Sequence, residues 1–224
     1  MKNMWFITGT DTNIGKTIVS TILLQKASQI GYNTAGYKPI AAGCVEKKHG
    51  LFNSDVLLLK KYSSVYLKYK EINLFSLKDF LPPNFFFEKN KKINLYQISQ
   101  GLKNLQKKSN WIIIEGIGGW YTPIFHTTNF AKWILIEKIP VILVIGIKLG
   151  CINHAILTYQ AIIKDKIKCS GWITNCCVNQ EEKYLKYYIK TIKKYIMAPY
   201  LGNLPYFQNI KNIFSKKNSI TLPK

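Results

Sequence analysis

The stretch from Phe6 to Thr17 contains residue types that bind a nucleoside triphosphate. An apolar run ends at Gly9, and Gly15-Lys16-Thr17 then opens an amphipathic segment, Ile18 to Ile30. Glycine lets backbone N–H groups approach phosphate oxygens, and the start of a helix adds partial positive charge. The lysine ammonium can reach the β- and γ-phosphates, and the threonine hydroxyl can ligate Mg²⁺. The pattern therefore predicts a phosphate-binding P-loop.

The alternative is a chance Gly-Lys-Thr triplet in a lysine-rich chain. Five residues separate Gly9 from Gly15, whereas the standard P-loop has four between its glycines. A strand is nevertheless predicted before the loop and a helix after it, which is the context that a P-loop requires. We therefore favour the P-loop.

Three further residues could act on a bound triphosphate. Glu115 ends the apolar run Trp111–Glu115, which suits a carboxylate that holds Mg²⁺ better than a solvated strand end. Asp55 follows Asn53 and Ser54, and it could be either a helix cap or a second magnesium carboxylate. Lys38 lies at the end of a predicted strand, where it could be merely exposed or could neutralise a phosphoryl group in transfer.

Length and composition predict a single domain over residues 1–224. The chain has 224 residues, of which 47% are hydrophobic, enough for a large core. No apolar run has the length of a membrane span, and no signal peptide is visible before the first predicted strand. The five cysteines show no metal-ligand spacing. We therefore expect a reduced, cytoplasmic protein.

The net charge of +21 could indicate a nucleic-acid-binding protein. Every basic residue other than histidine is a lysine, however, and the lysines are spread along the whole chain. Arginine is the preferred residue for bidentate contacts with phosphates and bases. We therefore expect partners that are small molecules, with no nucleic acid and no membrane; steeply salt-dependent DNA binding would favour the alternative.

Strands alternate with helices along the chain, which predicts an α/β fold: a P-loop NTPase-like parallel sheet with helices on both faces. Residues 64–94 are expected to be irregular with one short strand, residues 44–50 a polar loop, and the tail weakly patterned. The other expected strands and helices span 34–38, 53–62, 96–108, 111–115, 130–139, 141–145, 151–164, 171–175, 181–194 and 201–204. Ligands bind at the carboxyl ends of parallel strands. Gly9, Lys38, Glu115, Lys148 and Asn175 would lie at that edge.

The chain resembles the family of ATP-dependent dethiobiotin synthetases over nearly its whole length. The resemblance is weakest over residues 64–110 and beyond 207. It is carried by Thr8-Gly9-Thr10-Asp11-Thr12, Gly15-Lys16-Thr17, Thr34-Ala35-Gly36-Tyr37-Lys38-Pro39, Asn53-Ser54-Asp55, Ile112 to Glu115 with Gly116-Ile117-Gly118-Gly119-Trp120, Lys148-Leu149-Gly150-Cys151-Ile152-Asn153-His154, Gly171-Trp172 with Asn175, and Leu204-Pro205.

The resemblance implies that the protein is an ATP-dependent cyclo-ligase of biotin biosynthesis. Its substrates would be 7,8-diaminopelargonic acid, CO₂ and ATP, with Mg²⁺ as cofactor. One amine would form a carbamate, and the carbamate oxygen would then attack the γ-phosphate. The second amine would close the ureido ring of dethiobiotin, with release of ADP and phosphate.

The resemblance also implies roles for individual residues. Lys38, Lys16 and Thr12 would be catalytic, and Mg²⁺ would be held by Thr17, Asp55 and Glu115. The nucleotide would contact Asn13, Ile14, Gly15, Lys16, Thr17, Ile18, Asp55, Glu115, Gly116, Ile117, Gly118, Asn175, Cys176, Leu204, Pro205 and Tyr206. The substrate would contact Thr12, Lys38, Ala42, Gly150, Cys151, Asn153 and Tyr187. The last four of these would reach the substrate carboxylate from a neighbouring subunit, so the resemblance implies a homodimer.

Three positions depart from the family pattern. Ala42 stands where serine is frequent, Asn13 where an acidic residue is common, and Cys176 where aspartate is common. Loss of the hydroxyl at position 42 should weaken substrate binding by about 1 kcal/mol. All the lysine, phosphate and metal positions are retained.

Two other functions of P-loop proteins are disfavoured by the motifs. A ParA- or MinD-like partitioning ATPase would carry an additional lysine early in the loop, where this chain has Thr10-Asp11-Thr12. A GTPase would have an Asn-Lys-x-Asp motif, but Asn175 is followed by Cys176-Cys177-Val178.

Overall fold

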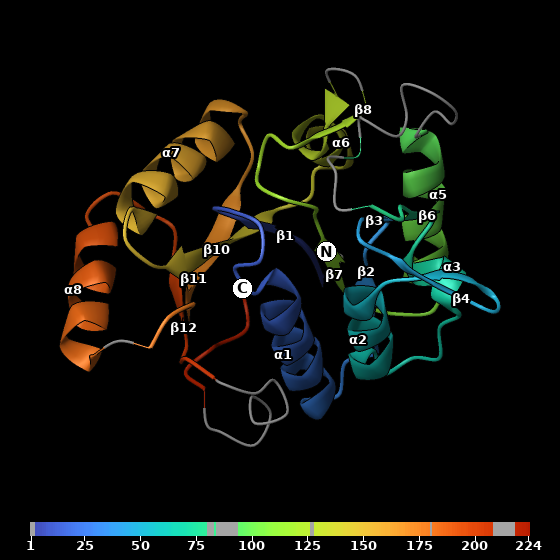
Figure 1. Cartoon of the computed structure of the whole chain (residues 1–224), viewed down its shortest axis with the longest axis horizontal. Coiled ribbons are helices and arrows are strands. Elements are labelled where there is room, and N and C mark those ends of the chain that lie inside the picture. Colours follow the sequence, from blue (N-terminus) through green and yellow to red (C-terminus); the bar gives the residue numbers. More distant parts are fainter. Residues whose placement is uncertain (1–2, 80–82, 84–93, 126–127, 180, 208–217) are drawn as a thin grey trace.

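A computed structural model describes residues 3–79, 83, 94–125, 128–179, 181–207 and 218–224 (Figure 1). Its main sheet contains strands that all run parallel. In spatial order these are β12, β11, β10, β1, β7 and β2, which span Tyr200–Leu204, Cys169–Cys176, Val141–Ile147, Asn3–Gly9, Trp111–Glu115 and Thr34–Tyr37. The predicted α/β class with a parallel sheet is confirmed.

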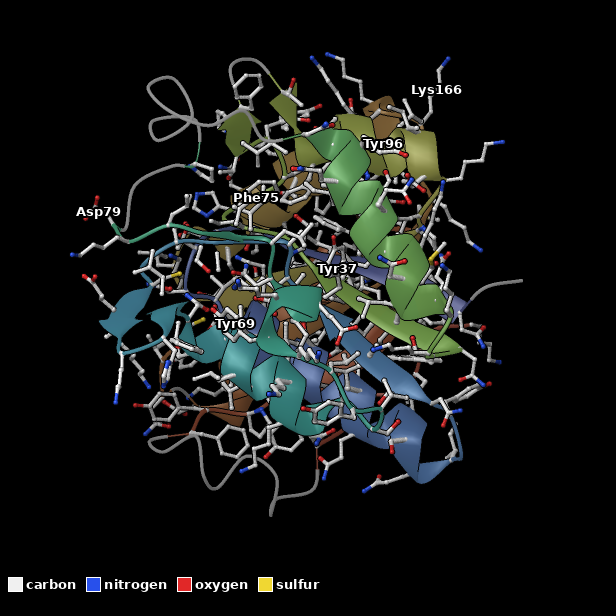
Figure 2. The ribbon with its side chains drawn as sticks, turned by 90° about the vertical axis from the view of Figure 1, so that its right-hand side faces the viewer. Tyr37, Tyr69, Phe75, Asp79, Tyr96 and Lys166 are labelled. Atoms are coloured by element: carbon white, nitrogen blue, oxygen red, sulfur yellow. The ribbon has the colours of Figure 1, made fainter. Side chains whose placement is uncertain are left out.

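The central strands are apolar because both faces of the sheet are covered. Every residue of β7 and β10 is buried, as their uninterrupted runs of isoleucine, valine and leucine predict. The principal helices are α1, α2, α5, α6, α7 and α8, which span Lys16–Gln29, Ser54–Tyr62, Leu95–Gln106, Phe130–Glu137, Cys151–Lys164 and Glu182–Ile192. In Figures 1 and 2, α1 and α2 cover one face, whereas α5, α6 and α7 lie on the other, and α8 packs beside α7.

The chain changes direction across the sheet at β1. It first moves from β1 to β2 at one edge and then returns through β7 to β10 on the other side of β1. Strand order therefore reverses at β1, and such a point is where α/β sheets bind ligands beyond the carboxyl ends of the strands. Gly9, Glu115 and Lys148 lie at these ends of β1, β7 and β10, respectively.

The segment between β2 and α5 is more structured than the sequence indicated. It contains β3 Ile40–Ala41, β4 Val45–Lys47, β5 Gly50–Phe52, α3 Tyr69–Ile72 and β6 Phe75–Ser76. The polar loop expected over residues 44–50 instead begins an antiparallel hairpin, β4–β5, whose Phe52 ring packs 4.8 Å from that of Tyr69. The short strand expected in residues 64–94 corresponds to β6, and residues 80–82 and 84–93 lie outside the described residues.

A buried tyrosine joins this region to the sheet. Tyr37, at the end of β2, donates a hydrogen bond from its hydroxyl to the backbone oxygen of Ile98 in α5 at 2.8 Å (Figure 2). A second short hairpin, β8 Pro123–Phe125 with β9 Thr128–Asn129, precedes α6. Among the helices of the described residues, none is both long and apolar enough to cross a membrane.

Residues 218–222 cover β12, which is an edge strand of the main sheet. The backbone N–H of Thr221 donates to the oxygen of Leu201 at 2.8 Å, and that of Asn203 donates to the Ser219 hydroxyl at 2.8 Å. Ile220 is buried, and its carbonyl accepts from the Lys26 ammonium of α1 at 2.5 Å. The tail therefore contacts both the sheet edge and the first helix.

Candidate active site

The loop between β1 and α1 has the geometry of a phosphate-binding loop. Asn13 and Gly15 take left-handed backbone conformations, with φ of 56° and 85°. The first turn of α1 carries no acidic residue and no side-chain cap. Its N–H groups are therefore available to an anion, whose charge the helix start also favours.

Asn175 of β11 braces this loop. Its side-chain amide donates to the backbone oxygen of Ile14 at 2.8 Å. A methyl group added at Gly15 would lie 2.3 Å from the same amide nitrogen. Gly15 is therefore required both by its backbone conformation and by the close approach of Asn175.

Lys16 is buried, and its ammonium donates to the backbone oxygen of Asp11 at 2.7 Å. Burial and the nearby charge of Lys38 lower its pKa from the usual 10.5 to about 8, although Glu115, Asp11 and Asp55 act in the opposite direction. An ammonium that has lost its hydration in this way gains from an anionic ligand. Lys16 is therefore suited to bind phosphate.

We expect ATP binding to take up a proton near pH 8, because phosphate favours the charged form of Lys16 and raises its pKa. The effect should disappear about two pH units lower, where Lys16 is already charged. Calorimetry in buffers of different ionisation enthalpy would measure it. The same uptake in Lys16→Met would assign the proton to another group.

Folding should release the Lys16 proton, whereas ATP binding takes one up, so the stability of the protein also depends on pH. The unfolded chain holds the Lys16 proton up to its usual pKa of 10.5, whereas the folded chain releases it near 8. The contribution of Lys16 to the free energy of unfolding should therefore increase as the pH rises from about 8 to 10.5.

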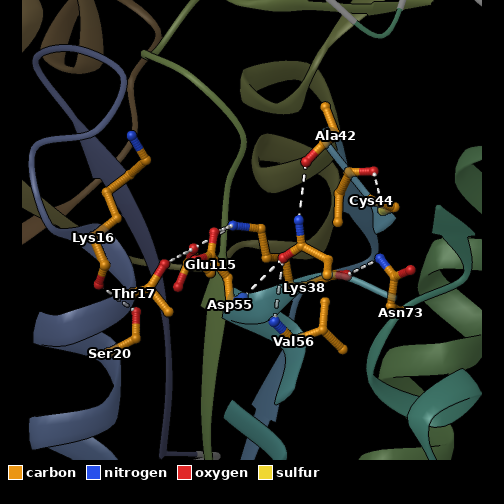
Figure 3. A network of polar contacts seen from close by, with 12 residues as sticks. Lys16, Thr17, Ser20, Lys38, Ala42, Cys44, Asp55, Val56, Asn73 and Glu115 are labelled. Carbon is orange, nitrogen blue, oxygen red and sulfur yellow. Dashed lines mark hydrogen bonds and ion pairs between the residues drawn. The ribbon is translucent and has the colours of Figure 1, made fainter. Parts of the chain in front are cut away.

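Four side chains from separate parts of the chain meet at one point: Thr17 in α1, Lys38 after β2, Asp55 in α2 and Glu115 in β7 (Figure 3). The Thr17 hydroxyl donates to Glu115 Oε1 at 2.7 Å. The Lys38 ammonium lies 2.6 Å from the same oxygen and 2.5 Å from Asp55 Oδ2. Figure 3 shows the Lys38 side chain reaching towards Glu115, whereas the Lys16 ammonium points away from it.

Lys38 is held as a buried cation. Burial lowers its pKa, but the charges and hydrogen bonds of Glu115 and Asp55 outweigh burial, so that the pKa is raised overall. Its backbone is fixed by hydrogen bonds from its own N–H to Ile72 and from the Asn73 side chain to its carbonyl, at 2.9 and 2.7 Å. Lys38 is therefore not an exposed strand end.

The structure excludes one of the two alternatives for Asp55. Asn53 is the residue that caps α2, since its side-chain oxygen accepts from the backbone N–H groups of Asp55 and Val56 at 2.9 and 3.4 Å. Asp55 lies inside the first turn, and its carboxylate reaches the Lys38 ammonium. The cap interpretation is therefore wrong.

The donor set fits Mg²⁺. Glu115 Oε2 is buried and is one of two buried side-chain oxygens without a hydrogen-bond partner in the described residues, the other being Ser170 Oγ. No group of three or more His, Cys, Asp or Glu in the described part of the chain could hold a metal by itself. Mg²⁺ commonly uses only one or two carboxylates together with substrate phosphates. The Thr17 hydroxyl and the carboxylates of Asp55 and Glu115 are oxygen donors of this kind.

The remaining residues predicted to contact nucleotide lie around the loop. Gly116 to Gly118 form the turn after β7, Cys176 is the buried last residue of β11, and Leu204 ends β12. Pro205 and the exposed Tyr206 follow. The residues predicted to contact nucleotide therefore lie at the carboxyl edge of the sheet, where the parallel order brings together positions far apart in sequence.

The predicted substrate residues fall into two groups. Thr12 and Ala42 lie near the P-loop and the Lys38 segment, with Thr12 exposed and Ala42 half-buried. Gly150, Cys151 and Asn153 lie at the start of α7, and Tyr187 lies on α8 with 65% of its surface exposed. Cys151 is buried, and its backbone N–H donates to the Lys148 carbonyl at 3.0 Å. The second group is not part of the Lys38 cluster.

One contact was not predicted from the sequence. Asp11 in the P-loop forms an ion pair with Lys148, which follows β10, at 2.7 Å. The positions of the two residues could have indicated the contact, because both residues follow strands that are neighbours in the sheet.

The fold and the site define a P-loop ATPase-like protein. The chain is similar to the MinD cell division protein of Aquifex aeolicus, with a TM-score of 0.60 and 11% identity over 94% of this chain and 85% of that one. It is also similar to a ParA family ATPase from Chlorobium tepidum, with a TM-score of 0.57, 14% identity and coverage of 96% and 90%. A family model described as an AAA domain matches residues 3–213.

Relatives with higher identity define the family. The ATP-dependent dethiobiotin synthetase of Buchnera aphidicola from Acyrthosiphon pisum (strain 5A) is 52% identical over the full length of both chains. That of Escherichia coli (strain K12) is 40% identical over 97% of each chain. The chain belongs to the ATP-dependent dethiobiotin synthetase family, which makes it an ATP-dependent ligase of biotin biosynthesis. The likeness to MinD and ParA concerns the fold alone.

Proposed function

We propose that the site catalyses the Mg²⁺-dependent carboxylation and ring closure of 7,8-diaminopelargonic acid. ATP and CO₂ are the co-substrates, and dethiobiotin, ADP and phosphate are the products. The observation that carries the proposal is the buried Lys38 ammonium, 2.5 and 2.6 Å from two carboxylates and adjacent to the P-loop. A protein that only hydrolysed ATP has no evident use for this second buried cation.

The reaction has three bond-forming steps. One substrate amine attacks CO₂ and loses a proton, which gives a carbamate. A carbamate oxygen then attacks the γ-phosphorus, and the bond to the ADP oxygen breaks. The second amine finally attacks the carbonyl carbon, which closes the ring and releases phosphate.

Lys16 and Lys38 are the residues suited to the second step. An anionic carbamate must approach an anionic phosphate, and positioned cations reduce that repulsion in the transition state. Thr12 and Ala42 would lie beside the substrate, and the loop from Asn13 to Ile18 would enclose the phosphates. Most of the catalysis would then be positioning and charge neutralisation.

Thr17, Asp55 and Glu115 would hold Mg²⁺ beside the phosphates. The ion would supply positive charge to the β- and γ-phosphate oxygens. Support comes from the unpartnered Glu115 Oε2 and from the hydroxyl of Thr17, 2.7 Å from Oε1 of the same carboxylate. Lys38 contacts the same carboxylates at 2.5 and 2.6 Å, and the third N–H donor of its ammonium would be available to the carbamate.

Adenine would be held by Asn175, Cys176 and the segment Leu204-Pro205-Tyr206, and Gly116 to Gly118 would line the nucleotide from β7. These residues lie on neighbouring parallel strands or directly after them. Asn175 pairs with Leu204 in the register of β11 and β12. The whole chain, residues 1–224, would act as a single cytoplasmic domain, to which the free state of all five thiols is suited.

Release of phosphate from ATP, with and without diaminopelargonate and bicarbonate, tests the proposal. Phosphate should appear in a one-to-one ratio with dethiobiotin, identified by mass spectrometry, and only when both co-substrates are present. Chelation of Mg²⁺ should stop the formation of both phosphate and dethiobiotin. Substrate-independent hydrolysis would instead support an ATPase switch, and salt-sensitive DNA binding with no turnover would support a nucleic-acid-binding protein.

The substrate carboxylate would be held from a neighbouring subunit in a homodimer. The start of α7, at Gly150, Cys151 and Asn153, carries the partial positive charge of a helix N-terminus, which favours an anion, and Tyr187 lies on α8. Support for an interface comes from large apolar or aromatic side chains on and beside these helices. With their exposed fractions, these are Leu149 (92%), Leu157 (56%), Tyr184 (50%) and Tyr187 (65%).

Mixed dimers provide a test of this arrangement. We expect inactive Lys38→Ala protein to regain activity when its subunits are exchanged with those of Asn153→Asp, whose added charge would repel the substrate carboxylate. Random exchange should restore about a quarter of the wild-type sites, because half of the dimers then contain one intact site. Absence of recovery after proven exchange would contradict the shared site.

A further inference from the structure

Asp11, in the P-loop, takes part in three hydrogen bonds. Its carboxylate accepts the backbone N–H of Thr12 at 2.7 Å through Oδ1 and the Lys148 ammonium at 2.7 Å through Oδ2. Its backbone carbonyl accepts the Lys16 ammonium at 2.7 Å. Lys148 and then the Thr12 N–H lower the pKa of the Asp11 carboxyl, so it is charged at neutral pH.

Lys148 connects the same carboxylate to the start of α7. It lies between β10 and the helix, and its carbonyl accepts the backbone N–H of Cys151 at 3.0 Å. Beneath the pair, β1 and β10 are joined in register, and the Thr10 N–H donates to the oxygen of Val144 at 3.0 Å. One lysine thus bonds to the P-loop through its ammonium and to the first turn of α7 through its carbonyl.

A separate contact holds the part of the loop next to α1. Gly15 and the start of α1 are braced by the Asn175 amide at Ile14, on the side of β11. The Asp11–Lys148 contact instead fixes Thr12 and the Gly150–Asn153 turn. Under the proposed function these are the two parts of the chain that contact diaminopelargonate at its amine and carboxylate ends.

We propose that Asp11 and Lys148 form a positioning pair that holds the two substrate-contacting segments, at Thr12 and at the start of α7, in place on the sheet. The inference rests on the proposed function for the identity of the substrate. In a homodimer each subunit would contribute the start of α7 to the neighbouring site, so the pair would act on both sites. Neither residue is proposed to touch the reacting atoms.

Loss of this pair should separate substrate affinity from nucleotide affinity. Its side chains are 40% and 43% exposed, so its contribution to overall stability should be small. Small displacements of substrate contacts are nevertheless costly to a reaction that depends on orientation. We expect Lys148→Met to raise the KM for diaminopelargonate about tenfold, with the Kd of ATP unchanged.

Four further variants complete the experiment. Asp11→Asn should raise the same KM, and the double variant Asp11→Asn/Lys148→Met should be no worse than either single one. Lys148→Arg should restore most of the substrate affinity. Lys78→Met removes a lysine from the exposed ion pair with Glu46, 2.9 Å long, and should behave as wild type.

A KM for Lys148→Met equal to that of Lys78→Met would overturn the proposal, as would a parallel rise in the Kd of ATP. If the wild-type protein formed no dethiobiotin, the proposed function would be wrong, but the role of the Asp11–Lys148 pair could still be tested. Amide hydrogen exchange would then test whether the Asp11–Lys148 pair holds the two segments in place. Faster exchange at Thr12 and at residues 151–153 in Lys148→Met would support it, and unchanged exchange would overturn it.

Discussion

Replacement of Lys38 by alanine is expected to lower the rate of dethiobiotin formation by at least roughly a hundredfold, the scale of losing one electrostatic stabiliser. ATP binding should remain largely intact, because Lys38 lies outside the P-loop, after β2. Lys38→Gln should do little better, since it retains most of the length but no charge. The measurements are steady-state turnover and ATP affinity by calorimetry.

The controls test what happens when the Asp55 and Glu115 carboxylates lose the Lys38 ammonium. Removal of one partner from a buried ion pair is destabilising, so the melting temperature must be compared in each variant. Mg²⁺ should raise it more in Lys38→Ala than in wild type, because both carboxylates are then free to bind the ion. Equal losses of ATP affinity and turnover would make Lys38 an ATP ligand, and full activity would remove it from the mechanism.

Gly15→Ala is expected to weaken ATP binding by at least about tenfold. The new methyl group would meet the Asn175 amide at 2.3 Å at a residue with φ of 85°, and a left-handed conformation costs an alanine about 1–2 kcal/mol. The loop can relieve both only by moving the N–H groups that face the phosphates. Nucleotide titration of the purified variant provides the measurement.

Gly31→Ala is the matched control for this substitution. Gly31 has a φ of 94°, but a methyl group there would meet no atom within 4 Å. It should therefore lose about 1 kcal/mol of stability and retain wild-type affinity for ATP. If Gly15→Ala also bound ATP normally, the loop would not depend on the close approach of Asn175.

Hydrophobic pattern was sufficient to predict the elements that form the core. The expected ranges for β7 and α7 coincide with the observed ones, because an unbroken apolar run and a helical repeat are both local signals. The β4–β5 hairpin was missed. Its formation depends on the packing of Phe52 against Tyr69, a residue 17 positions away in sequence and in another element.

The site was predictable as a set of residues but not as a set of contacts. Strand ends identified Lys38 and Glu115, yet nothing local indicated that one ammonium would pair with both Glu115 and Asp55. Asn53 and Asp55 are equally good caps by type, and only the three-dimensional structure assigns that role to Asn53. The Asp11–Lys148 pair likewise depends on the order of strands in the sheet, which sequence spacing does not specify.

The return of residues 218–222 to β12 has a consequence for how the protein behaves in concentrated solution. An uncovered edge strand presents free N–H and C=O groups that can recruit a strand from another molecule. Here the Leu201 carbonyl already accepts from the Thr221 N–H, and the Asn203 N–H already donates to the Ser219 hydroxyl. Neither group is therefore free to pair with a strand of another molecule. Removal of the last seven residues should therefore open a self-association surface along β12.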